Sequence, residues 1–108
     1  MIFNIFVGNS ISNKELIKKT NNFFESSKKY KRSDLTIFAP RDDNYIISIF
    51  DKRIKITITD NDTNCNGISS IYDYIETVLK NKSVYVRGSE KFNYELLSEI
   101  KNVSITRI

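Results

Sequence analysis

The amino-acid sequence predicts a single α/β domain, close to the boundary with α+β folds. We expect a mixed sheet of five to six strands and about three helices in the order βαβββαβαβ. The 108 residues suit one hydrophobic core, since single domains typically hold about 100–150 residues. A hydrophobic content of 40% is enough to fill that core. The length therefore predicts that residues 1–108 form one domain.

The first third of the chain predicts a strand, a helix and a second strand. Residues 2–7 are apolar at nearly every position, which is typical of a central strand buried on both faces. Ser12 and Glu15 then have the spacing of a capping box. Apolar residues at helical spacing follow, so we expect a helix that continues to residue 30. Residues 35–39 predict the second strand, which ends before a proline.

The middle of the chain predicts a β-hairpin. Residues 45–50 and 53–59 are two apolar-rich runs separated only by Asp51 and Lys52. In the second run Ile alternates with Arg, Lys and Thr, so one side should face the core and the other water. We expect this hairpin to be antiparallel and to lie toward an edge of the sheet.

The remaining sequence predicts a loop and then four further elements. Residues 60–67 are polar and predict the loop, and residues 68–79 have the periodicity of a helix. Residues 84–86 predict a short strand, residues 92–100 a third helix and residues 103–108 a final strand. So short a strand-helix-strand unit favours two parallel strands joined by a right-handed crossover.

Composition and charge bear on the source and location of the protein. Ile, Asn and Lys dominate the sequence and Ala occurs once, at Ala39. This bias is typical of AT-rich genomes and suggests a low-GC bacterium, its phage or plasmid, or an AT-rich virus. The single cysteine, Cys65, cannot form an internal disulfide. No apolar run reaches the roughly 18–20 residues that cross a bilayer. We expect a soluble protein, without a membrane partner, in the cytoplasm of a bacterium or an infected host cell.

The sequence argues against most enzyme classes. Histidine is absent, which removes the usual general base at neutral pH and excludes Ser/His/Asp and Cys/His catalysis. Cys65 has no nearby basic residue to activate its thiol. We therefore expect no catalytic residue and no cofactor. Metal-dependent phosphoryl hydrolysis conflicts least with the residues present.

Two glycine-containing turns, each between a predicted strand and a predicted helix, are candidate ligand sites. Free amides and the positive end of a helix dipole favour anions at such turns. If the two strands are parallel neighbours, both turns line one crevice and form a site for a nucleotide or another phosphorylated ligand. Neither turn completes a recognised phosphate-binding motif, so the interpretation that the glycines only permit tight turns is the favoured one. The residues concerned are Gly8, Asn9, Ser10, Arg87, Gly88, Ser89 and Lys91.

Residues 6–12 of this chain, FVGNSIS, resemble the opening strand-to-helix turn of the viral ring nucleases, which destroy cyclic oligoadenylate signals. That family uses a histidine, and this chain has none. The resemblance therefore implies only that nucleotides belong among the ligands to consider, and it assigns no residue a role.

A basic face on the first helix and its exit is the candidate site for nucleic acid. Phosphate contacts combined with aromatic stacking would suit such a ligand. However, Phe23 and Phe24 share the apolar stripe of the helix and are expected in the core, and a solvated helix face explains the cations equally well. The cations are Lys14, Lys18, Lys19, Lys28, Lys29, Lys31 and Arg32.

Four carboxylates in two polar segments are candidate metal ligands. They would gather at one end of the predicted hairpin, where a close pair could hold Mg²⁺. The second segment begins like a calcium loop but departs from the EF-hand pattern at Cys65. Turn preference explains Asp at these positions as well. The four residues are Asp42, Asp43, Asp60 and Asp62.

These observations favour a small binding or regulatory protein, such as an inhibitor from a phage or mobile element that acts stoichiometrically on a host protein. Tyrosines are the expected anchors, because Tyr and Arg contribute strongly to interface energetics. The alternatives are a phosphorylated ligand at the glycine turns and nucleic acid at the basic helix face. The tyrosines are Tyr45, Tyr74, Tyr85 and Tyr94.

Overall fold

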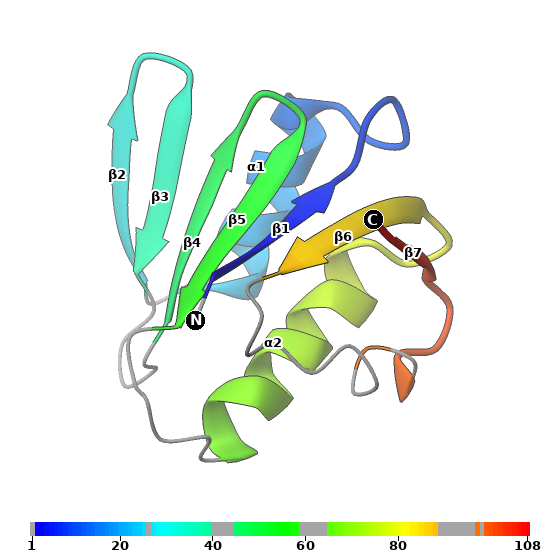
Figure 1. The fold of residues 1–108 in the computed structure, drawn as a ribbon. Helices are drawn as coiled ribbons and strands as arrows, with labels where there is room; N and C mark the ends of the chain where they lie inside the picture. Colours follow the sequence, from blue (N-terminus) through cyan, green and yellow to red (C-terminus); the bar gives the residue numbers. More distant parts are fainter. Residues whose placement is uncertain (1, 26, 40–44, 59–64, 89–96, 98) are drawn as a thin grey trace.

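The computed structural model describes residues 2–25, 27–39, 45–58, 65–88, 97 and 99–108, and for residues 65–69 it describes the backbone alone. These residues form a mixed seven-stranded sheet and two α-helices (Figure 1). The elements are β1 (Ile2–Phe6), α1 (Asn13–Phe23), β2 (Lys28–Arg32), β3 (Leu35–Ala39), β4 (Tyr45–Phe50), β5 (Arg53–Ile58), α2 (Cys65–Val78), β6 (Ser83–Gly88) and β7 (Ser104–Arg107). The predicted class is confirmed, while the numbers of strands and helices differ from the prediction.

The strands follow the order β2-β3-β4-β5-β1-β6-β7 across the sheet. Every neighbouring pair is antiparallel except β6 and β7, which are parallel. The antiparallel hairpin around Asp51 and Lys52 and the parallel pair at the end of the chain are therefore confirmed. The hairpin lies in the middle of the sheet and not toward an edge, because β1 pairs with β5 and β3 pairs with β4.

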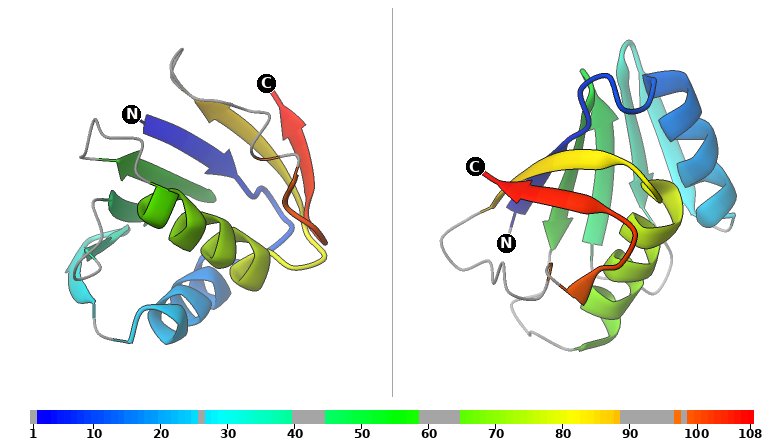
Figure 2. Two further views of the ribbon diagram at one scale, coloured as in Figure 1. Left: turned by 90° about the horizontal axis from the view of Figure 1, so that it is seen from below. Right: turned by 90° about the vertical axis from the view of Figure 1, so that its right-hand side faces the viewer.

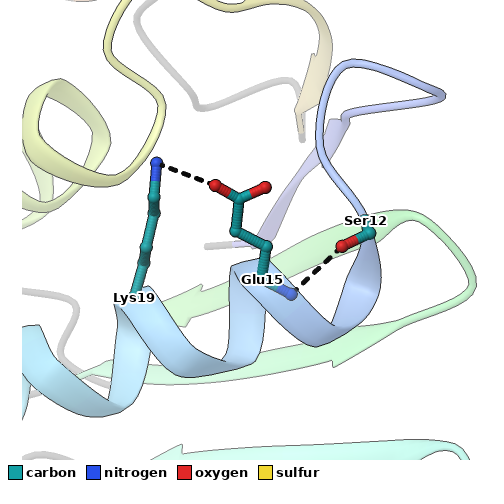
Figure 3. Close-up of polar contacts among 3 residues, drawn as sticks. All are labelled: Ser12, Glu15 and Lys19. Carbon is teal, nitrogen blue, oxygen red and sulfur yellow. Dashed lines mark hydrogen bonds and ion pairs between the residues drawn. The ribbon is translucent and has the colours of Figure 1, made fainter.

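The first helix is shorter than predicted, and the strand β2 follows it. Ser12 caps the helix by accepting a hydrogen bond from the backbone N–H of Glu15 at 3.2 Å (Figure 3). The helix ends at Phe23, whereas a helix to residue 30 was predicted. Residues 28–32 instead form an edge strand that pairs with β3. The tight turn between them, in which Ser33 has a φ of 52°, makes that pairing possible.

Both helices lie on the same face of the sheet, so the molecule has two layers (Figure 2). Phe24, at the end of α1, packs against Tyr45 of β4 and Tyr74 of α2, with ring centroids 6.1 and 5.2 Å apart. Phe23 also packs against this core, which confirms the core position predicted for both phenylalanines. Alternate strand residues point into this layer and are buried, including Phe38, Ile47 and further isoleucines of β4 and β5.

β1 is central, as predicted, but it is buried on one face only. Phe3 and Ile5 are in the core. Ile2 is 41% exposed, and Asn4 and Phe6 are half-buried. The prediction of burial on both faces was wrong, because no described helix covers the second face of the sheet (Figure 2).

Two differences concern the second half of the chain. α2 begins at Cys65, three residues before the predicted start at Ile68, so it takes up part of the predicted loop 60–67. Most of the predicted helix 92–100 lies outside the described residues. Within it, Leu97 and Ile100 are buried in the core. In the part of the chain that is described, neither helix is long and apolar enough to cross a membrane.

Candidate functional site

Gly8 and Gly88, the glycines of the two predicted turns, do not come together in this fold. β1 and β6 are neighbours, as the crevice requires, but they are antiparallel, with Phe6 opposite Tyr85 and Phe3 opposite Gly88. The turn at Gly8 follows the Phe6 end of β1, whereas Gly88 lies at the opposite end of the pair. Antiparallel neighbours place their carboxyl ends at opposite edges of a sheet, so the condition for a shared crevice is not met.

The side chains of the first glycine turn hold the turn itself in place. Gly8 has a φ of 54°, a conformation that glycine adopts readily. Asn9 accepts a hydrogen bond from Lys52 Nζ at 3.0 Å, and the Ser10 hydroxyl donates to the Ser83 carbonyl oxygen at 2.8 Å. These bonds tie the turn to the β4–β5 hairpin and to the start of β6. A structural role thus accounts for Asn9 and Ser10.

In the second turn only part of the predicted site is described. Arg87 is exposed and lies in β6, and Gly88 is half-buried at the end of that strand. Ser89 and Lys91 lie outside the described residues, as do the carboxylates Asp42, Asp43, Asp60 and Asp62. Among the described residues, no three Asp, Glu, Cys or His side chains are grouped as metal ligands.

The predicted basic face is divided between two elements. Lys14, Lys18 and Lys19 lie on α1, where Lys19 forms an ion pair with Glu15 at 3.5 Å (Figure 3). The other four cations, Lys28, Lys29, Lys31 and Arg32, belong to β2. Since strand residues alternate between the two faces of a sheet, the β2 cations divide again. Lys29 points to the helix side, over the ring of Phe38 at 5.8 Å.

The tyrosines predicted as binding anchors lie in different environments, some buried and some exposed. Tyr45 and Tyr74 are 2% and 0% exposed, so they belong to the core and cannot contact a partner. Tyr85 is 54% exposed on β6. Tyr94 lies outside the described residues. Tyr30 of β2, which was not singled out as an anchor, is 56% exposed.

The face of the sheet opposite the helices, here called the outer face, carries a continuous aromatic and cationic row. Cross-strand partners share a face, and the register places Phe50 of β4 beside Arg53 of β5, Arg53 beside Phe6 of β1, and Phe6 beside Tyr85 of β6. The Arg53 guanidinium carbon lies 4.3 Å from the ring centroid of Phe50 and 5.7 Å from that of Phe6. Four neighbouring strands thus contribute to one π-rich row.

A second row runs beside the first, displaced from it by two residues on each shared strand. It crosses six strands through the register pairs that join Tyr30, Ile37, Ser48, Lys55, Asn4 and Arg87. Two residues along a strand span about 6.6–6.8 Å. Lys55 and Arg87 therefore lie beside the aromatic row and not within it.

The outer-face positions of the described strands carry charge of one sign. These positions hold five cations, and none of the outer-face positions in the described strands is Asp or Glu. The nearest acidic residues of the β2–β3 and β4–β5 hairpins are in their turns, at Asp34 and Asp51. The five cations are Lys28, Arg32, Arg53, Lys55 and Arg87.

A hollow of about 440 Å³ opens on the outer face at the Phe50 end of the first row, beside Ser48 and Lys55 of the second row. Its lining includes Leu35, Ser48, Phe50 and Lys55 from β3, β4 and β5, and its rim is formed by Ser33, Asp34 and Asp51 of the two hairpin turns. Both turns lie at the same end of the sheet (Figure 1). A second hollow, of about 580 Å³, lies behind the same turns, between them and the first turn of α1.

Little of this arrangement was visible in the sequence. The alternation of residues 53–59 correctly placed Arg53, Lys55 and Thr57 on one side of a strand. Nothing local, however, indicated that this side would adjoin Phe6 and Tyr85, because those contacts depend on the strand order. Comparisons of the chain with models of protein families, with curated proteins and with solved structures found no match.

Proposed function

We propose that this chain is a small binding protein for single-stranded nucleic acid, and that the ligand lies across the outer face of the sheet. The observation that carries the proposal is the row Phe50–Arg53–Phe6–Tyr85, flanked by the cations Lys55 and Arg87. Aromatic rings and guanidinium planes are the surfaces on which unpaired bases stack.

The charge of the face supports the same ligand. Cations that a polyanion contacts strengthen its binding, and nearby carboxylates weaken it. The outer-face positions of the described strands carry cations and no carboxylates. The net charge of +4 acts in the same direction. A single strand suits this face better than a duplex, because the row of rings can stack only with bases that are not already paired.

Binding of a fluorescently labelled single strand, followed by anisotropy at low salt, tests the proposal. A mixed-sequence strand of about twelve nucleotides is within the roughly 4–16 nucleotides that small binding domains cover. The same sequence is offered as DNA, as RNA and as a duplex. We expect the single strands to bind more tightly than the duplex.

Two variants locate the site. Tyr85→Ala removes an exposed ring, and it should weaken binding about 5- to 150-fold, since stacking contributes about 1–3 kcal/mol per base. Arg87→Gln should weaken binding by removing one phosphate contact. Lys80→Gln, in the connection between α2 and β6, is the matched control. Binding that depends on Lys14 and Lys18 of α1, but not on Tyr85, would contradict the proposed site.

The principal rival proposal is that of a stoichiometric inhibitor of a host protein. Exposed Tyr and Arg are also the residue types of protein interfaces, and Tyr30, Tyr85 and Arg87 satisfy that description on the outer face. Failure of every single strand to bind at low salt would favour this rival. The Tyr85→Ala variant would then serve to test the same face against a protein partner.

A further inference from the structure

We infer that the hollow beside Phe50 is a pocket for one unstacked base, and that it selects guanine. This inference rests on the proposed function, because the pocket lies at the Phe50 end of the first outer-face row and beside Ser48 and Lys55 of the second row. Its volume of about 440 Å³ is within the range of about 300–1,000 Å³ that small-ligand pockets span.

The floor of the pocket suits a flat, apolar ring. Leu35 of β3 and Phe50 of β4 supply its apolar surface, and Ser48 lies two residues before Phe50 on the same face. All three are half-buried, so they are held by the sheet while part of each remains open to a ligand. Arg53 lies over the Phe50 ring from β5, whereas Leu35 belongs to β3, on the other side of β4.

The rim of the pocket carries hydrogen-bond acceptors. Asp34 from the β2–β3 turn and Asp51 from the β4–β5 turn both line the hollow, and both are exposed. An ionised carboxylate only accepts hydrogen bonds, and its two oxygens can accept two parallel bonds. The pocket therefore favours a base edge that presents two adjacent donors.

Guanine is the base with such an edge. Its N1–H and 2-amino group lie side by side, while adenine and cytosine place an acceptor nitrogen next to their amino group. The single N–H of uracil or thymine lies between two carbonyl oxygens. A carboxylate would repel these acceptors. Lys55 and Arg32 at the same hollow supply positive charge for the phosphate of the inserted nucleotide.

The test compares single strands of thymidine, or of uridine for RNA, that carry one central guanosine, adenosine, cytidine or inosine. We expect the guanosine strand to bind at least about fivefold more tightly than the adenosine and cytidine strands, since a bidentate contact discriminates by this much or more. Inosine lacks the 2-amino group and should lose most of the gain. The preference should hold in the DNA series, the RNA series or both.

Two variants assign the preference to the rim. Asp34→Asn and Asp51→Asn keep residues that suit turns, and either one should reduce the preference for guanosine without weakening the all-thymidine strand. Asp73→Asn, on the exposed side of α2, is the matched control. Equal binding of all four strands, with affinity still dependent on Tyr85, would overturn the pocket and leave the proposed function intact. If no strand binds, both are overturned.

Discussion

At the scale of single residues, Tyr74 is the side chain whose chemistry the fold changes most clearly among those described. It is fully buried, and its hydroxyl shares a hydrogen bond of 2.8 Å with Thr20, which links α2 to α1. Burial raises the pKa of Tyr74 far above its ordinary value, the nearby Tyr45 adds to the rise, and the bond with Thr20 offsets part of it. The folded protein therefore holds this proton more strongly than the unfolded chain.

This difference predicts a loss of stability in alkaline solution. In the unfolded chain Tyr74 should ionise near its ordinary pKa of about 10. Below that pH its contribution to the free energy of unfolding is therefore fully present. As the pH rises further the unfolded state releases the proton first, and the free energy of unfolding should fall by up to about 1.4 kcal/mol per pH unit from this residue. Denaturant unfolding of the wild type between neutral pH and pH values above 10 would measure the slope.

The variant Tyr74→Phe tests whether Tyr74 causes this alkaline loss of stability. It should remove this part of the alkaline slope, and at neutral pH it should cost about 1–3 kcal/mol because Thr20 loses a buried partner. Tyr85→Phe, which changes an exposed tyrosine, is the control and should leave the slope as it is. An alkaline slope that is the same in Tyr74→Phe and in the wild type would contradict the interpretation.

At the scale of elements, β2 offers a test that compares two double variants of equal net charge. Its five residues alternate between the two faces of the sheet, so Lys28 and Arg32 lie on the outer face with Tyr30, and Lys29 and Lys31 lie on the helix side. The double variant Lys28→Gln/Arg32→Gln should therefore weaken binding of a single strand. The variant Lys29→Gln/Lys31→Gln removes the same charge and should bind like the wild type.

Salt dependence measures this difference. For single strands the logarithm of the binding constant falls with the logarithm of salt concentration by about 0.7 per phosphate contact, so loss of two contacts should reduce the slope by about 1.4. Equal slopes in the two double variants would mean that only the total charge of β2 matters. That result would count against the outer face as the site.

Elements with strong local signals could be predicted from the sequence. Ser12 caps α1 as its spacing with Glu15 indicated. Asp51 and Lys52 form a two-residue turn in which both have positive φ, 48° and 59°, as a tight hairpin needs. β2 could not be predicted in this way. Its run of Lys, Lys, Tyr, Lys and Arg has no apolar alternation, and it becomes a strand only because β3 offers a free edge.

At the scale of the whole molecule, the pairing of distant strands determines which residues form a site. Gly8 and Gly88 were both predicted to lie in anion-binding turns, yet the antiparallel pairing of β1 and β6 places them at opposite ends of the pair. The same pairing places Tyr85 beside Phe6 and Arg87 beside Asn4. Local patterns could identify each strand and its exposed side, but the outer face exists only once β1 is inserted between β5 and β6.

Because both helices cover one face, the molecule has two chemically distinct sides, and a footprint on the wild-type protein can tell them apart (Figure 2). Lysines are modified with an amine-reactive reagent in the absence and presence of a saturating single strand, and the extent of modification is measured by mass spectrometry. Lys28 and Lys55 on the outer face should become protected, since bound phosphates and bases would cover them. Lys18 on α1 and Lys101, which lies outside the strands, should react as before. Protection of Lys18 without protection of Lys55 would mean that the nucleic acid binds the helix layer, because a nucleic-acid strand bound across the sheet would also cover Lys55.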